Sequence, residues 1–89
     1  MSNQTLIARI EASLGRLQVH QGDSRALAES IRGNGKALEG IPYHLIKEIE
    51  DLAMDLDIAQ WHDEDGFSPE IGPILVRVHS WLEKLPRDV

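Results

Sequence analysis

The sequence contains no cysteine and few aromatic residues: two tryptophans, one tyrosine and one phenylalanine among 89 residues. The lack of cysteine excludes disulfide bonds, thiolate metal sites and a cysteine nucleophile. So few aromatic side chains disfavour a surface on which the bases of single-stranded nucleic acid would stack. No apolar run approaches the roughly 20 residues needed to cross a membrane, and the first residues do not resemble a secretory signal. We therefore expect a cytoplasmic protein with no membrane contact.

Basic residues are missing from one long stretch of the chain. The formal net charge is −6, but residues 1–40 carry five basic and four acidic residues, whereas residues 41–89 carry four basic and eleven acidic residues. Between Glu48 and Glu70 there are nine acidic residues and no lysine or arginine. Because such a region repels phosphate groups, the sequence predicts no direct binding of nucleic acid.

Apolar residues recur at spacings of three and four in four segments, and the alternation typical of β-strands is nearly absent. The segments are residues 3–19, 24–32, 42–60 and 69–85. Short stretches of glycine and polar residues separate them, which is typical of neighbouring helices that run antiparallel. The sequence therefore predicts an all-α protein, folded as a single compact four-helix bundle with short loops.

The ends of the predicted helices carry recognisable signals. Asp23 or Ser24 can cap the second helix, and Pro42 suits the first turn of the third. The run Gly33-Asn34-Gly35 is expected to break the helical pattern as a turn or a kink, and residues 61–66 to form a polar loop. The fourth helix is apolar on almost all sides, which is typical of a central helix or of a seam between two copies of the chain. A homodimer is therefore possible.

The acidic tract has two interpretations. It is either a solvated face that keeps a small protein soluble or a docking surface for a basic protein, since opposed charge speeds encounter and adds selectivity. Under the second interpretation the partner-binding residues are Glu48, Asp51, Asp55, Trp61, Asp63, Glu64, Asp65 and Phe67. The two aromatic residues of this set could instead cover one end of the bundle as part of its core, and we favour that position for them.

The sequence contains no convincing constellation for catalysis. The acidic residues lie on one helix face and one loop, where similar surroundings would not separate a general acid from a general base. We therefore predict no catalytic residue and no cofactor. His62, Asp63 and Asp65 are the remaining candidates for holding a divalent metal, although a helical metal site normally draws ligands from two or more helices.

One segment resembles a known family. The run Asp65-Gly66-Phe67-Ser68-Pro69-Glu70, followed by Ile71, Val78 and Trp81, is similar to the start of the last helix in bacteriocin-nuclease immunity proteins. That family also consists of small acidic four-helix proteins, so the resemblance implies an inhibitor or immunity role. The paired tyrosines that the family carries before this loop are absent here, where Ala59-Gln60-Trp61-His62 stands instead. We therefore infer no membership.

The sequence leads to a first hypothesis and two alternatives. The first is a small non-enzymatic interaction protein, such as an inhibitor, immunity protein, antitoxin or adaptor, which binds a basic protein through the acidic face of residues 42–60 and the loop 61–70. The second is an inhibitor that mimics nucleic acid with its acidic surface. The third is a small divalent-metal-binding protein or enzyme.

Overall fold

The computed structural model describes residues 2–19, 21–64 and 71–87, without the side chains of residues 63 and 64. Helix α1 (Asn3–Gln18) begins after Ser2, whose hydroxyl accepts a hydrogen bond from the Thr5 N–H at 3.2 Å. This bond satisfies one of the amides that a helix leaves unpaired at its start. The buried face of α1 is the one that the apolar spacing predicted, and it includes Leu6, Ile7, Ile10 and Leu14.

Helix α2 (Ser24–Gly35) is three residues longer than predicted. Asp23 is its cap, because the carboxylate accepts a hydrogen bond from the Ala26 N–H at 2.7 Å. The predicted break at residues 33–35 is wrong: these residues form the last turn of the helix. Ile31 and Gly35 are both buried, and such tertiary contacts offset the low helix propensity of glycine.

Helix α3 (Tyr43–Glu64) continues four residues beyond its predicted end. Its first turn is anchored on Pro42, whose carbonyl accepts hydrogen bonds from the N–H groups of Leu45 and Ile46. The prediction of a loop at residues 61–66 is therefore wrong for residues 61–64, which are helical. None of these four residues is glycine or proline, so no backbone feature ends the helix there. Residues 65–70 lie outside the described residues.

Helix α4 (Gly72–Glu83) starts later than its predicted first residue, with Pro73 in the first turn. Ser68 and Pro69, which the sequence places at the helix start, lie outside the described residues. Val78, Trp81 and Leu82 are buried, whereas Val76 is exposed. The fourth helix thus has a solvent-facing side despite its apolar sequence.

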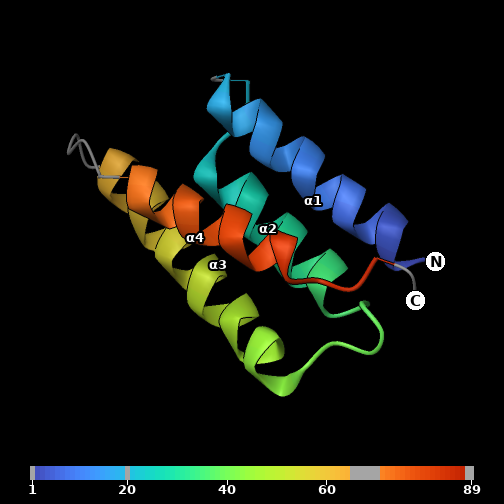
Figure 1. The fold of residues 1–89 in the computed structure, drawn as a ribbon. Coiled ribbons are helices and arrows are strands. Elements are labelled where there is room, and N and C mark those ends of the chain that lie inside the picture. The colour runs from blue at the N-terminus through green and yellow to red at the C-terminus, as the bar shows by residue number, and fades with distance from the viewer. Residues whose placement is uncertain (1, 20, 65–70, 88–89) are drawn as a thin grey trace.

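The four helices of the described residues form an all-α bundle, as the sequence predicts (Figure 1). Helix α2 packs against α1 and α3, and α4 packs against α3. The Ser24 N–H donates to the Gln60 side chain at 3.1 Å, and Gly35 lies against Ile49. The start of α2 is therefore beside the end of α3, so these two helices run antiparallel. The radius of gyration of 12.7 Å is close to the value of about 12 Å expected for a compact domain of this length.

The bundle has one hydrophobic core to which all four helices contribute. Its largest fully buried side chain is Trp81 of α4, whose indole N–H donates a hydrogen bond to the Leu45 carbonyl of α3 at 2.9 Å. Asn3, at the start of α1, is a second fully buried hydrogen-bonding group. Its side chain bonds to the backbone of Glu39 and Pro86. Through these hydrogen bonds, Trp81 and Asn3 join segments that are distant in the sequence.

The two glycines in the last turn of α2 are expected to respond differently to alanine. A Cβ atom on Gly33 would meet nothing within 4 Å, whereas one on Gly35 would lie 3.1 Å from Cδ1 of Ile49. Gly33→Ala should therefore raise the free energy of unfolding by about 0.5–1 kcal/mol, the usual gain for replacing glycine in a helix. Gly35→Ala should lose this gain because Ile49 has to move. Urea unfolding checks the difference, and equal stability of the two variants would contradict the close approach of α2 and α3.

Candidate functional site

The predicted partner-binding residues lie along α3 and beyond its end. Asp51 is exposed, Glu48 and Asp55 are half-buried, and Trp61 is 58% exposed. Trp61 is therefore not a core residue, which corrects the expectation that it covers the end of the bundle. Asp63 and Glu64 belong to the last turn of α3, but their side chains lie outside the description. Asp65 and Phe67 lie wholly outside the described residues.

Basic residues from neighbouring helices neutralise part of the negative charge on the acidic face of α3. Arg77 of α4 pairs with Asp55, with 2.6 Å between Nη1 and Oδ2. Arg32 of α2 pairs with Asp57 at 2.7 Å and with Glu50 at 3.4 Å. Asp55, one of the predicted docking residues, is therefore engaged within the molecule. The sequence could not show these pairs, because they depend on which helices lie side by side.

The ion pairs also shift the pKa of two groups. The hydrogen bond with Asp57 is the main reason that the pKa of Arg32 lies above its ordinary value. A hydrogen bond from Lys36 is the main cause of the lowered pKa of Glu50, and Arg32 lowers it further. Both shifts favour the charged forms of Arg32 and Glu50.

Glu48 and Asp51 have no ion pair among the residues that the structure describes. They lie on α3 at a spacing of three, so both are on one side of the helix. The uncompensated charge that the sequence predicted for the acidic face is therefore found at Glu48 and Asp51, and not at Asp55.

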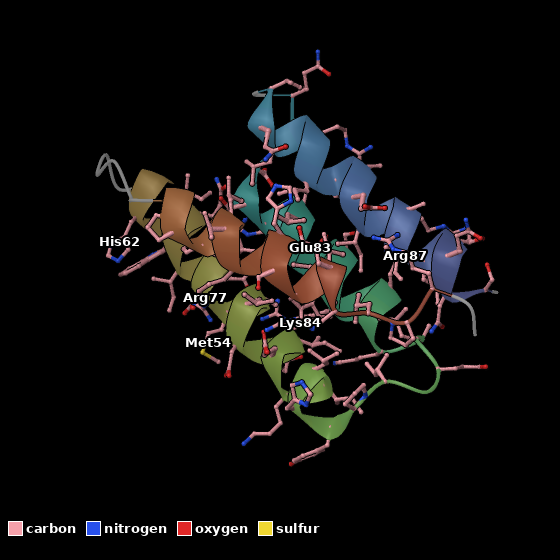
Figure 2. All side chains as sticks on the ribbon, viewed as in Figure 1. Met54, His62, Arg77, Glu83, Lys84 and Arg87 are labelled. Carbon is pink, nitrogen blue, oxygen red and sulfur yellow. The ribbon has the colours of Figure 1, made fainter. Side chains whose placement is uncertain are left out.

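A row of exposed apolar side chains follows the solvent-facing side of α3. Met54 is 55% exposed, Ile58 46% and Trp61 58%. Their spacing of four and then three residues places them on one face, opposite the buried stripe of the same helix. Figure 2 shows Met54 on the side of α3 that faces away from α1. We call Met54, Ile58 and Trp61 the α3 apolar row.

Sequence reasoning named Trp61 as a partner-binding residue but missed Met54 and Ile58, because it assigned the rest of the outward face to acidic residues. The signal was present, since Met54, Ile58 and Trp61 repeat with the helical period but out of phase with the core positions Leu45, Ile49 and Leu52. The row is bordered by Asp51 on one side and by Asp57 on the other, according to the helical spacing. It is therefore an apolar strip inside an acid-rich surface.

Of the three candidate metal ligands, only the side chain of His62 belongs to the part of the chain that the structure describes. His62 lies in the last turns of α3, with its ring 5.3 Å from that of Trp61, measured between ring centres. The side chain of Asp63 and all of Asp65 lie outside the description. Within residues 2–19, 21–62 and 71–87, no group of three histidine or acidic side chains is arranged to hold a metal ion. His79 instead contacts Gln18, at 3.1 Å between the two Nε2 atoms, and joins α4 to α1.

Comparisons of the chain with family models, with curated proteins and with solved structures found no match. The resemblance of residues 65–81 to immunity proteins therefore stays an expectation. In the part of the chain that the structure describes, no helix has both the length and the apolar character needed to cross a membrane.

Proposed function

We propose that the protein is a non-enzymatic interaction module that binds a basic protein through the outward side of α3. The observation that carries this proposal is the α3 apolar row, in which three large apolar side chains are each about half exposed. Isolated exposed apolar residues are common, but an aligned row with a tryptophan is the kind of centre on which protein interfaces gain most of their binding energy. Docking on it would remove Met54, Ile58 and Trp61 from water together.

The charge around the row selects the kind of partner. Glu48 and Asp51 are without ion pairs among the described residues, and the sequence adds Asp63, Glu64 and Asp65 beyond the row. A second copy of the chain would bring a like charge against this face, which is unfavourable. A partner with lysine or arginine around an apolar centre complements it. Glu50, Asp55 and Asp57 pair with arginine or lysine side chains. Their negative charge is therefore partly neutralised within the molecule, which gives the hypothesis of a nucleic-acid mimic less support.

Two synthetic helical peptides test the proposal. Both carry leucine at i, i+4 and i+7, and they differ only in having lysine or glutamate at the flanking positions. We expect the lysine peptide to shift the backbone amide signals of residues 51–61 in NMR titrations, and the glutamate peptide to leave them in place. Trp61→Ala should weaken binding of the lysine peptide about tenfold or more, the usual cost of removing a central aromatic residue.

Val76→Ala provides the matched control, because Val76 is 67% exposed but belongs to α4. Its dissociation constant for the lysine peptide should equal that of the original protein. Equal binding of the two peptides, or a dissociation constant that Trp61→Ala leaves unchanged, would refute the proposed docking face. Raising the salt concentration should weaken binding of the lysine peptide, because the charges involved are exposed and therefore screened.

A further inference from the structure

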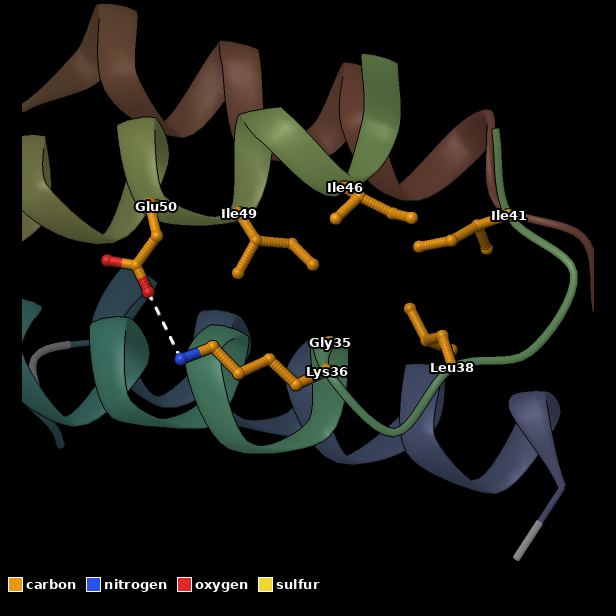
Figure 3. Close-up of a pocket in the computed structure, with 7 residues that line it drawn as sticks. All are labelled: Gly35, Lys36, Leu38, Ile41, Ile46, Ile49 and Glu50. Carbon is orange, nitrogen blue, oxygen red and sulfur yellow. Dashed lines mark ion pairs between the residues drawn. The ribbon is translucent and has the colours of Figure 1, made fainter. Parts of the chain in front are cut away.

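An apolar pocket of about 230 Å³ lies where the end of α2, the connection to α3 and the first turns of α3 meet (Figure 3). Its apolar lining consists of Gly35, Leu38, Ile41, Ile46 and Ile49. Figure 3 shows Leu38 and Ile41 of the connection facing Ile46 and Ile49 of α3. This pocket shares no residue with the α3 apolar row, whose first residue, Met54, lies about one turn beyond Glu50, the last α3 residue at the pocket.

The local backbone explains why this space is open. Gly35 has no side chain, so α2 approaches Ile49 closely and Gly35 lines the pocket with backbone alone. The connection then turns at Gly40, whose φ of 67° is in the left-handed region that glycine adopts without strain. Leu38 and Ile41 are consequently only partly buried, and Ile46 is 47% exposed. Apolar surface is thus left accessible in a concave site.

Two opposite charges stand at the pocket. Nζ of Lys36 lies 3.3 Å from Oε1 of Glu50, and Oε2 of Glu50 lies 3.4 Å from Nε of Arg32. Glu50 therefore pairs with two cations, Arg32 and Lys36. Lys36, in contrast, pairs only with Glu50 among the described residues. An incoming anion can therefore form an ion pair with Lys36 while Glu50 stays paired with Arg32. An incoming cation would have to compete with both Arg32 and Lys36 for the same carboxylate.

We propose that this pocket binds a small amphiphilic carboxylate, with its apolar part against Leu38, Ile41 and Ile46 and its carboxylate on Lys36. The size fits such a ligand: a cavity of about 150 Å³ holds benzene, and drug-sized ligands occupy sites of about 300 Å³ or more. The volume of 230 Å³ therefore suits a phenyl ring or a short alkyl chain. This ligand is of opposite charge to the basic protein proposed for α3, so the two sites take different partners.

Three small compounds test the site by NMR of the isoleucine and leucine methyl groups. The compounds are 3-phenylpropionate, 3-phenylpropylamine, which differs in its charge, and propionate, which lacks the ring. We expect 3-phenylpropionate to shift the methyl signals of Leu38, Ile41 and Ile46 in a saturable manner. The amine should bind at least about threefold more weakly, the range expected for losing one exposed ion pair, and propionate should give no saturable shift.

Variants at Lys36 separate charge from shape. Lys36→Gln should weaken 3-phenylpropionate binding about threefold to fivefold, and Lys36→Arg should restore it. Lys36 is exposed, and its ion pair with Glu50 is at the surface, so the variants should fold normally. Lys84→Gln, which removes an exposed lysine that does not line the pocket, should leave binding unchanged. The proposal is overturned if the amine binds as tightly as the carboxylate, if Lys36→Gln has no effect, or if the shifts occur at other methyl groups.

Discussion

Replacing Trp81 with alanine is expected to lower the free energy of unfolding by about 3–5 kcal/mol. Trp81 is fully buried and is the largest such side chain in the core, so its removal leaves a cavity between α3 and α4. Its indole N–H also donates to the Leu45 carbonyl at 2.9 Å. The variant therefore loses packing and a buried hydrogen bond together, whereas a domain of this length has a total stability of only about 4–13 kcal/mol.

Two further variants make the effect of Trp81 measurable even if Trp81→Ala does not fold. Trp81→Phe keeps most of the ring but removes the N–H group, and it should cost about 1–3 kcal/mol. Trp61→Ala removes the same type of side chain from an exposed position and should change stability by no more than about 0.5 kcal/mol. Urea unfolding followed by far-UV circular dichroism measures all three. Comparable losses for Trp61→Ala and Trp81→Phe would contradict the burial assigned to the two tryptophans.

The core could be predicted because helical periodicity places residues on a face without any knowledge of the neighbouring helices. Leu6, Ile10 and Leu14 of α1 recur every four residues and are all buried. The broad stripe of α3, including Leu45, Leu52 and Leu56, is buried in the same way. Hydrophobic burial is the dominant favourable term in folding. The pattern that reports it was therefore sufficient for the fold class.

The helix ends were harder to predict because they depend on the balance of weak local preferences and tertiary contacts. The glycines at the end of α2 are poor helix formers, yet Gly35 is buried against Ile49 and the helix includes it. At the end of α3, residues 61–64 are polar, which suggested a loop, but polarity alone does not break a helix. Polarity indicates exposure, whereas the end of a helix depends on glycine, proline and caps together with the tertiary contacts that can override them.

The candidate site was predicted in part. Periodicity along residues 42–60 correctly put Glu48, Asp51 and Asp55 away from the core stripe, and the roles assigned to them stay predictions. The pairing of Asp55 with Arg77 could not be foreseen, because the two residues are 22 positions apart and meet only when α4 packs on α3. The pocket beside Lys36 was also missed. It depends on the path of the connection between α2 and α3, for which sequence periodicity gives no information.

Asn3 is the buried polar residue whose surroundings most restrict what can replace it. Its Nδ2 donates to the Glu39 carbonyl at 2.8 Å and to the Pro86 carbonyl at 3.0 Å. Its Oδ1 accepts from the Glu39 N–H at 2.9 Å. One side chain, which is 1% exposed, thus joins the start of α1 to the α2–α3 connection and to the segment after α4. Both a donor and an acceptor are required at this position.

Asn3→Asp is expected to lower the free energy of unfolding by about 3 kcal/mol or more at neutral pH, because it buries a charge that faces two carbonyl oxygens. An acidic residue in the first turn of a helix normally stabilises by about 0.3–1 kcal/mol, so a helix-end effect alone predicts the opposite sign. Asn34→Asp is the matched control. The Asn34 side chain is half-exposed and hydrogen-bonds only to Ser30 among the described residues, so this variant should lose less than about 1 kcal/mol.

The pH dependence of Asn3→Asp separates a buried charge from a simple loss of packing. Burial beside two carbonyl groups raises the pKa of the introduced carboxyl in the folded state above its value in the unfolded chain. Its ionisation therefore destabilises the fold above the unfolded pKa, and the deficit relative to the original protein shrinks as the pH falls. The protonated carboxyl can then donate to one of the carbonyls of Glu39 and Pro86. Urea unfolding at several pH values measures the deficit. A deficit that stays constant between acidic and neutral pH would show that the carboxyl reaches solvent, which would contradict the burial of residue 3 against Glu39 and Pro86.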